Sequence, residues 1–264
     1  MEFNDVLRGI GDGVTPIEIQ LERVRDSSAH LVTTVAALDE FALRAPSLLP
    51  GWSRAHVVVH LSRNADAQLR MIEAALRGER GEQYPGGEKG RAREIEEGVT
   101  ADAEAVIAGP RSSVSALERR WTTLPEHAWE LGTVTLRSRR TVREGITARW
   151  REVEIHHADL AGDYTPANWP MEFVEEFLGR TISKLPPRLL PGAAETGFRW
   201  RLVDRDTTHS WLVDTEAVGA GAGAADVEVS GSGWQLLAWL CGRGDHGLKV
   251  AGGSGRLPEI SVYG

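Results

Sequence analysis

The sequence predicts an α+β protein in which a four-helix bundle is followed by a small α+β domain. In the first part of the chain, apolar residues recur every three or four positions over four long stretches, which is the spacing of amphipathic helices. Beyond a segment rich in proline and glycine, short runs of β-branched and aromatic residues are separated by turn residues, as in strands. We therefore expect a helical bundle at residues 1–165, and a helix with the small α+β domain at residues 166–264.

Four stretches are expected to form the long helices of the bundle. Ser53 can act as the N-cap of the second helix. The pair Gly109-Pro110 lies inside the third stretch and is expected to kink or break it. Connections of varied length between four long helices are typical of a bundle. The predicted helices span residues 15–46, 53–78, 100–121 and 139–162.

Residues 79–98 are rich in glycine and in charged side chains. We interpret them as a long, partly mobile loop. Such a loop can form part of a lid over a substrate, although a charge run of this kind is also typical of solvated surface. Further along the chain, residues 125–131 predict a short helical turn, and residues 133–140 predict an extended segment.

The second part of the chain predicts a small α+β domain. Residues 171–185 predict a fifth long helix, which the proline- and glycine-rich linker LPPRLLPGAAETG follows. The segments FRWRLVD and THSWLVD predict a β-hairpin, and the sequence VGAGAGAA after them predicts a loose loop. DVEVSGS then predicts a third strand, residues 232–241 a helix, and LKVAGG a last short strand.

The overall composition excludes several classes of protein. The net charge of −8 and the pI of about 5.6 argue against broad electrostatic binding to nucleic acid. No run of about 18 apolar residues exists, so no membrane span is expected. The N-terminus lacks the basic and apolar regions of a signal peptide, and the single cysteine, Cys241, rules out an intramolecular disulfide framework. We therefore expect a cytoplasmic protein.

The segment TARWREVEIHHADLAGD, residues 147–163, carries the first pair of candidate ligands. Its apolar helical stripe includes Trp150, Val153 and His157. Glu152 and His156 lie beside this stripe and are four residues apart, so their side chains stack on one face of the helix. A carboxylate and an imidazole one turn apart can share a divalent metal ion. Two ligands do not complete a site, so a third must come from elsewhere.

The second helix offers two candidates for the third ligand. His56, His60, Asn64 and Gln68 form a polar line on an otherwise core-facing helix, where buried polar groups need partners. His60 is the better candidate because it lies next to the apolar ridge, whereas His56 lies in the first turn, near the loop. Two neutral imidazoles and a carboxylate suit Zn²⁺ or a similar divalent ion, with positions left open for water or substrate.

The spacing alone leaves a structural interpretation open. A glutamate and a histidine four residues apart also occur together by chance, and a histidine on a bundle face is usually a hydrogen-bonded core or surface residue. His157, on the apolar stripe, is expected to be a packed core histidine. Glu154 and Asp159 are expected to be surface charges.

Three ordered segments of the chain together resemble the mycothiol-dependent maleylpyruvate isomerase family, which belongs to the DinB-like metalloenzymes. The segments are GWSRAHVVVHLSRNAD, RWREVEIHHADLAGD and VSGSGWQLLAWLCGRGD. The resemblance covers nearly the whole chain and implies a DinB-like, metal-binding four-helix bundle with a small C-terminal α+β domain. In that family, the second histidine of the first segment and the glutamate and histidine of the second bind a divalent metal, commonly zinc. These positions are His60, Glu152 and His156 here, the set that the spacing also favours.

The same resemblance implies mycothiol, a low-molecular-weight thiol of actinobacteria, as the thiol cofactor. It gives a catalytic role to Arg243, in the motif GRG, whose guanidinium suits a carboxylate. We assign cofactor binding to Arg243 and to Asn64, which closes the first motif. The alternative for Arg243 is a surface arginine after a helix end. Cys241 is expected to be a buried structural thiol, because the family takes its nucleophile from mycothiol.

The resemblance implies cis–trans isomerisation of maleylpyruvate to fumarylpyruvate by reversible thiolate addition. One alternative is a mycothiol S-transferase that acts on another electrophile, in detoxification or natural-product biosynthesis. A second alternative is a non-catalytic, metal-stabilised protein that binds a small ligand. The expected partners are mycothiol and a small-molecule electrophile, with no nucleic acid and no membrane, and the expected state is a monomer or a weak dimer.

Overall fold

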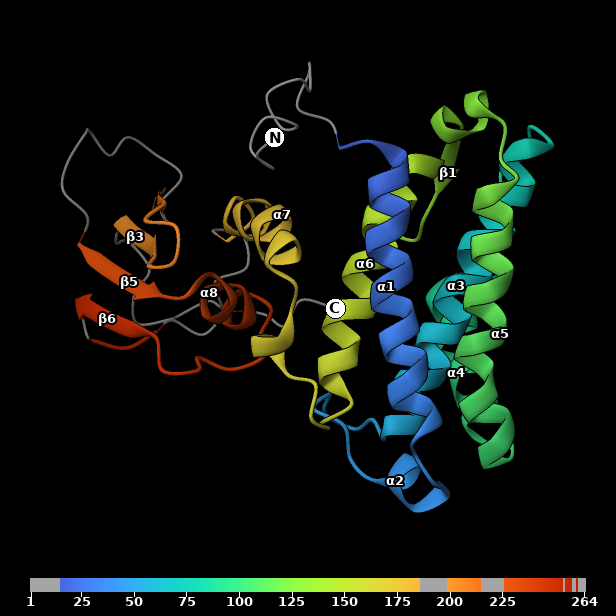
Figure 1. Ribbon diagram of the computed structural model, residues 1–264, viewed down its shortest axis with the longest axis horizontal. Helices are drawn as coiled ribbons and strands as arrows, with labels where there is room; N and C mark the ends of the chain where they lie inside the picture. Colours follow the sequence, from blue (N-terminus) through green and yellow to red (C-terminus); the bar gives the residue numbers. More distant parts are fainter. Residues whose placement is uncertain (1–14, 186–198, 215–225, 254, 258–259, 261–264) are drawn as a thin grey trace, which may run out of the picture. The chain divides into compact units, whose positions relative to one another are not determined.

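The computed structural model describes residues 15–185, 199–214, 226–253, 255–257 and 260. By its internal contacts the chain divides into two compact units, Met1–Gly162 and Asp163–Gly264 (Figure 1). The predicted linker LPPRLLPGAAETG and the predicted loop VGAGAGAA lie almost wholly outside the described residues. Each unit is described by itself below.

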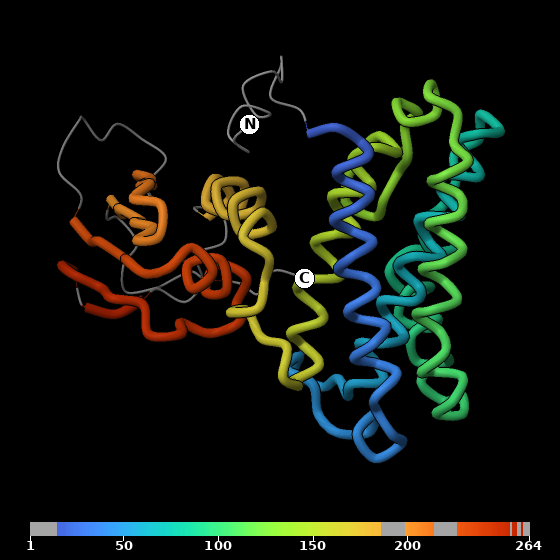
Figure 2. The backbone as a smooth tube through the Cα atoms, in the orientation of Figure 1, coloured from blue at the N-terminus to red at the C-terminus, as the bar shows by residue number. Residues whose placement is uncertain are grey.

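The first unit is a four-helix bundle, as predicted. Each of its long helices packs against two of the others, with α1 against α5 and α6, and α3 against α5 and α6. Figure 2 shows that α1 and α6 run in one direction and that α3 and α5 run in the opposite direction. The bundle helices are α1 (Ile17–Ala36), α3 (Arg54–Leu76), α5 (Ala103–Thr122) and α6 (Val142–Asp159).

The core of the bundle follows the predicted apolar stripes. On α6 every residue of the predicted stripe is buried, and from Val153 to Leu160 the other residues are buried as well. Thr141 fixes where α6 begins, because its hydroxyl accepts a hydrogen bond from the Glu144 amide while the Glu144 carboxylate accepts one from the Thr141 amide. The buried members of the α6 stripe are Val142, Ile146, Trp150, Val153, His157 and Leu160.

The prediction of one continuous helix over residues 15–46 is wrong in its second half. Helix α1 ends at Ala36, and the short helix α2 (Glu40–Arg44) follows as a separate element. Asp39 starts α2, because its backbone is extended and its carboxylate accepts a hydrogen bond from the Ala42 amide. An apolar periodicity that continues across the gap does not reveal this interruption.

Of the kink or break predicted at Gly109-Pro110, the break is wrong, and the kink stays a prediction. Helix α5 continues through Pro110, whose side chain is buried. A proline inside a helix removes one backbone hydrogen bond, so it needs compensation from packing. Burial of Pro110 among the bundle helices supplies that packing, and Ser113 satisfies an acceptor nearby by donating to the Gly109 carbonyl.

Residues 79–98 do not form the predicted long loop. Residues 87–99 form helix α4 (Gly87–Val99), which packs against α3. Figure 2 shows that α3 and α5 run in the same direction and that the chain between them returns along the bundle, in part as α4. The remaining turn is held by Gln83, whose carbonyl accepts from Arg70 and whose side chain accepts from the Leu136 amide.

Close packing positions α4. A Cβ atom on Gly90 would lie 1.8 Å from the Pro85 carbonyl oxygen, and one on Gly98 would lie 2.5 Å from a methyl group of Val59 on α3. The two glycines therefore allow neighbouring atoms to approach the α4 backbone closely, and flexibility is not their role.

Between α5 and α6 the chain forms a short 3-10 helix and a β-hairpin, close to the predicted turn and extended segment. These elements are η3 (Glu126–Glu130), β1 (Gly132–Val134) and β2 (Arg139–Thr141).

The second unit contains the predicted strands and helices. Its four-stranded sheet has the order β4-β3-β5-β6, in which β3 pairs antiparallel with β4 and parallel with β5, and β5 pairs antiparallel with β6. The strands are β3 (Arg199–Asp204), β4 (Ser210–Asp214), β5 (Val227–Gly231) and β6 (Lys249–Gly252). The helices are η4 (Pro166–Asn168), α7 (Met171–Ile182) and α8 (Gly233–Leu240), and the rings of Trp239 on α8 and Trp200 on β3 lie 6.5 Å apart.

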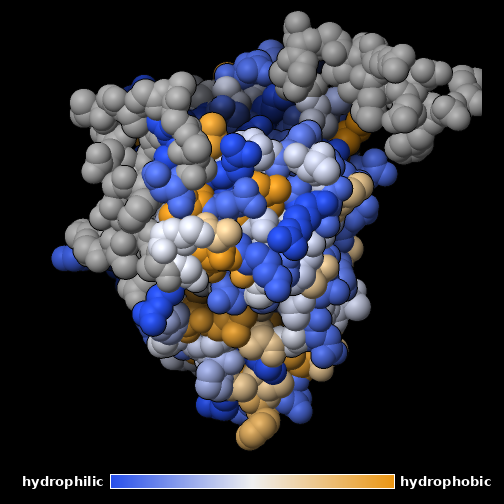
Figure 3. Space-filling view, turned by 90° about the vertical axis from the view of Figure 1, so that its left-hand side faces the viewer, coloured by the Kyte–Doolittle hydropathy of each residue, from blue (hydrophilic) through white to orange (hydrophobic). Residues whose placement is uncertain are grey.

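In the described part of the chain, no helix is long and apolar enough to cross a membrane. On the face drawn in Figure 3, hydrophilic residues separate the hydrophobic ones into patches.

Candidate metal centre

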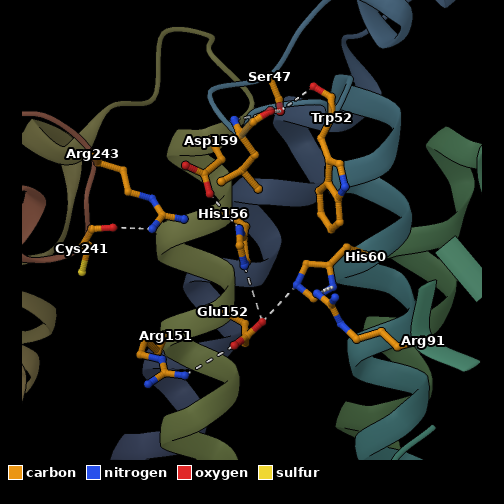
Figure 4. Close-up of polar contacts among 11 residues, drawn as sticks. Ser47, Trp52, His60, Arg91, Arg151, Glu152, His156, Asp159, Cys241 and Arg243 are labelled. Carbon is orange, nitrogen blue, oxygen red and sulfur yellow. Dashed lines mark hydrogen bonds and ion pairs between the residues drawn. The ribbon is translucent and has the colours of Figure 1, made fainter. Parts of the chain in front are cut away.

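Helices α3 and α6 bring the three predicted ligands together. Glu152 and His156 lie one turn apart on α6, and His60 faces them from α3 (Figure 4). The Nε2 atom of His60 lies 3.1 Å from Glu152 Oε2, and the Nε2 atom of His156 lies 3.7 Å from the same oxygen. One donor atom from each of the three residues lies within 4.8 Å of the others. His56, the other candidate, instead accepts from the Ser53 amide at the start of α3.

Asp159 fixes the orientation of His156. Its carboxylate lies 2.8 Å from His156 Nδ1, and its side chain is 1 % exposed. The prediction that Asp159 is a surface charge is therefore wrong. The loop before α3 covers this end of α6, because the Leu48 amide donates a hydrogen bond to the Asp159 carbonyl. With Nδ1 bound to Asp159, Nε2 of His156 is the nitrogen that points at Glu152 (Figure 4).

Trp52 and Arg91 surround the other side of His60. The Trp52 ring centroid lies 5.7 Å from that of His60, and the Arg91 guanidinium lies over the Trp52 ring at 5.8 Å. Arg91 Nη2 is 3.3 Å from His60 Nδ1. Sequence reasoning missed both residues. Trp52 belongs to the segment GWSR but was not given a role, and Arg91 lies in the segment interpreted as a loop.

Burial and charge set the protonation of the cluster. Burial lowers the pKa of His60 to about 4, although its hydrogen bond with Glu152 acts in the opposite direction. His60 is therefore neutral near pH 7. Burial alone would raise the pKa of Glu152, but the hydrogen bond with His60 and the neighbouring imidazole and arginine charges outweigh it and hold that pKa well below the usual range. Arg151 Nη2 lies 3.6 Å from the other carboxylate oxygen of Glu152.

This donor set fits a divalent metal ion. Neutral imidazole nitrogens and an ionised carboxylate are ligands that zinc binds, and three protein ligands leave a position for water or substrate. Two Nε2 atoms converge on one carboxylate oxygen, as a shared ion between them would require. The Asp159–His156 contact is the kind of hydrogen bond that orients a ligating histidine.

Three other buried polar residues of the two helices, Asn64, His157 and Glu154, have structural partners. Asn64 is buried, and its side-chain oxygen accepts a hydrogen bond from Arg149, so a role for Asn64 in cofactor binding stays a prediction. His157 is the packed core histidine expected, with Nε2 2.8 Å from the Thr34 hydroxyl. Glu154 was predicted at the surface but is 2 % exposed and accepts a hydrogen bond from Ser27.

Arg243 and Cys241 follow α8 in the second unit. Cys241 is 2 % exposed, which agrees with the expected buried thiol. Arg243 is also buried and donates a hydrogen bond to the Cys241 carbonyl, so it is not the exposed arginine of the alternative interpretation. Gly242 and Gly244 have positive φ angles of 75° and 97° and form the turn that holds Arg243. The contribution of Arg243 to a catalytic site stays a prediction.

Comparison with known proteins places these observations in a family. A protein-family profile described as the mycothiol maleylpyruvate isomerase N-terminal domain matches residues 24–161, which include all three cluster residues. No curated protein sequence matches the chain significantly.

Solved structures give a similar result over more of the chain. A crystal structure of the mycothiol-dependent maleylpyruvate isomerase has 26% sequence identity and a TM-score of 0.80, and the match covers 94% of this chain and 98% of that one. A histidine-to-alanine mutant of that isomerase matches with the same values. YfiT from Bacillus subtilis, described as a probable metal-dependent hydrolase with an unusual four-helix bundle topology, matches with a TM-score of 0.45 and 16% identity over 58% of this chain and 89% of its own.

Proposed function

The chain belongs to the family of mycothiol maleylpyruvate isomerase N-terminal domains, and from that membership we propose that it is a metal-dependent enzyme that uses mycothiol. The reaction proposed is cis–trans isomerisation of maleylpyruvate to fumarylpyruvate. The observation that carries the proposal is the convergence of His60 Nε2 and His156 Nε2 on the Glu152 carboxylate. The likeness of the whole chain to a solved mycothiol-dependent maleylpyruvate isomerase supports it.

The chemistry follows from the ligands. A divalent ion held by His60, Glu152 and His156 would stabilise a bound thiol as its thiolate near pH 7, where a free thiol with a pKa of about 8.5 is mostly protonated. Reversible addition of the thiol sulfur to one carbon of the cis double bond leaves a single bond. Rotation about that bond and loss of the thiol give the trans isomer, so no atom is gained or lost.

The protein's own side chains prepare this site. Burial keeps His60 neutral, so it could bind an ion through Nε2 once its one ring hydrogen lies on Nδ1. Asp159 holds the hydrogen of His156 on Nδ1 and leaves Nε2 available in the same way. Arg243 is proposed to bind a carboxylate of the substrate through its bidentate fork.

The test is a turnover assay on zinc-loaded protein with maleylpyruvate and mycothiol, in which fumarylpyruvate is measured. The variant His156→Ala should lose turnover, and His127→Ala should keep it, because His127 is exposed on η3. Turnover that needs both mycothiol and His156 would support the isomerase. Turnover without mycothiol would contradict the proposal.

The second candidate is a mycothiol S-transferase for another electrophile. Sequence identity of 26% to the solved isomerase conserves a fold more readily than a substrate, and this observation keeps the candidate open. Zinc-loaded protein would be incubated with mycothiol and a panel of electrophiles, and adducts would be sought by mass spectrometry. Adducts without fumarylpyruvate would favour the transferase, whereas zinc binding with neither product would favour a non-catalytic ligand-binding protein.

A further inference from the structure

The two histidines of the cluster differ in what faces their second ring nitrogen. His156 Nδ1 faces the Asp159 carboxylate, a hydrogen-bond acceptor, at 2.8 Å. His60 Nδ1 faces the Arg91 guanidinium, which can only donate, at 3.3 Å. A histidine that binds a metal through one nitrogen carries its hydrogen on the other and normally donates it to an acceptor. His156 meets this requirement, and His60 does not.

A metal ion on His60 Nε2 would therefore place two hydrogen-bond donors, His60 Nδ1–H and the Arg91 guanidinium, face to face. Without the ion, Nε2–H can donate to Glu152 and Nδ1 can accept from Arg91. With the ion on Nε2, the hydrogen lies on Nδ1, and the N–H groups of His60 and Arg91 repel. An acceptor placed between them restores both hydrogen bonds. Among the described residues, Arg91 has no carboxylate within ion-pair distance.

The surroundings of Arg91 hold it beside the cluster while allowing this adjustment. Its guanidinium lies over the Trp52 ring, which attracts a cation without binding it in one hydrogen-bond geometry. Tyr84 lies within hydrogen-bonding reach of Arg91, and burial raises the pKa of this phenol to about 12, so it stays uncharged. An oxygen shared by Arg91 and His60 would need an N···O distance of about 2.8 Å to each, so the Arg91 head must move outward from its 3.3 Å contact. Its long side chain permits that movement.

We propose that Arg91 and the Nδ1–H of metal-loaded His60 together bind a carboxylate group of the substrate. This inference rests on the proposed function in two respects: it uses the same metal centre, and it assumes a small substrate that carries a carboxylate. One carboxylate oxygen accepts from His60, and the guanidinium fork holds the carboxylate from α4. Arg91 is thus a substrate-binding residue that helix α4 supplies.

The first experiment measures binding of succinate to the zinc-loaded protein by calorimetry. Succinate carries the carboxylates but has no double bond, so no thiol can add to it. The variant Arg91→Met removes the charge and keeps a side chain that can lie on Trp52, and it should weaken succinate binding at least about 10-fold. Arg91→Lys should fall between wild type and Arg91→Met, because it keeps the charge but loses the fork. Dimethyl succinate, which lacks the charges, should not bind.

The matched control is Arg93→Met, two residues further along α4. The Arg93 side chain is 62% exposed and lies 3.8 Å from Glu97 on its own helix. This variant should bind succinate as wild type does. All variants should retain their zinc content and melting temperature, which separates a lost contact from a lost fold. Unchanged succinate affinity in Arg91→Met, or no succinate binding by zinc-loaded wild type, would overturn the inference.

Steady-state kinetics distinguish the source of the carboxylate and separate this inference from the proposed function. Arg91→Met should raise the KM for maleylpyruvate at least about 10-fold and leave the KM for mycothiol unchanged. A rise in the KM for mycothiol alone would overturn the assignment to the substrate. Wild-type protein that binds succinate through Arg91 but shows no mycothiol-dependent turnover would contradict the proposed function and leave the inference standing.

Discussion

At the scale of single residues, the cluster depends on side chains that are not ligands. Asp159 is buried at the end of α6, with its carboxylate on His156 and its carbonyl on the loop before α3. Asp159 thus orients the candidate ligand His156 and also holds the loop that leads into α3, the helix that carries His60. Partners of this kind orient a ligating imidazole and raise its basicity, so their loss lowers metal affinity.

Asp159→Asn should weaken zinc binding by about 10- to 100-fold, because the neutral amide no longer holds the hydrogen on His156 Nδ1 as the carboxylate does. Zinc affinity would be measured by competition with a chromophoric chelator. The control is Asp102→Asn, at an exposed position where the side chain makes no capping hydrogen bond. Equal zinc affinity for Asp159→Asn and wild type would show that the contact has no part in ligand orientation.

The three cluster residues could be predicted because helical spacing places Glu152 beside His156 and His60 next to a core ridge, and the family resemblance favoured the same set. Asp159 could not, since an aspartate near a helix end is usually exposed and its covering loop is remote in sequence. Arg91 was hidden for another reason. Its place beside His60 depends on the path of a connecting segment, and local composition does not record that path.

At the scale of elements, α4 is where composition misled. Glycine and charge in residues 79–98 predict a loop, but Gly90 and Gly98 permit close packing and the charges lie on a helix surface. The better signal was topological. A connection between two neighbouring helices that run in the same direction must cross the length of the bundle (Figure 2). Helix α3, with 23 residues, is about 34 Å long, so the return has room for an element of its own, and the 13 residues of α4 cover part of it.

Gly90→Ala should lower the free energy of unfolding by about 1–3 kcal/mol, because a Cβ atom 1.8 Å from the Pro85 carbonyl forces the backbone apart. It should also weaken succinate binding, since α4 carries Arg91. Denaturant titration and calorimetry would measure the two effects. Gly132→Ala is the control, because its Cβ would meet no atom within 4 Å and should leave both quantities near wild type. A fully stable Gly90→Ala protein would mean that α4 shifts freely on Pro85.

At the scale of the whole molecule, the division into a bundle and an α+β unit followed from periodicity, because burial of one face determines where apolar residues can stand. Periodicity also placed His157 in the core, but it did not predict the burial of Glu154 or the polar partners of either residue. His157 and Glu154 are both buried, and their partners Thr34 and Ser27 lie on α1, remote in sequence. Such pairs leave no periodic signature, but they make the stability of the bundle depend on pH.

Burial lowers the pKa of His157 to about 3, and the neighbouring charge of His30 is a smaller cause in the same direction. An unfolded histidine titrates near 6.5, so unfolding takes up a proton below that pH. The stability that neutral His157 contributes is thus complete above pH 6.5 and is lost as the pH falls toward 3. The loss should amount to about 1.4 kcal/mol per pH unit between pH 6 and pH 4.

His157→Gln should therefore reduce the slope with which the free energy of unfolding falls between pH 6 and pH 4. This holds however much the substitution lowers the free energy of unfolding at pH 7. Urea unfolding of the metal-free protein, followed by the helical circular dichroism signal, would measure the slope without a contribution from zinc release. His127→Gln, at an exposed position on η3, should keep the wild-type slope. A wild-type slope in His157→Gln would place the acid sensitivity elsewhere.

The burial of the only cysteine has a consequence for life under oxidative stress. When a cell's small thiols are oxidised, they cap exposed protein thiols as mixed disulfides, and the capped protein must be reduced before it works again. Cys241, the single cysteine in the sequence, is 2 % exposed. If the chain is the mycothiol-dependent enzyme proposed above, such conditions would oxidise its thiol cosubstrate but would not modify the enzyme's own buried sulfur. Its activity would then return as soon as the reduced thiol pool did.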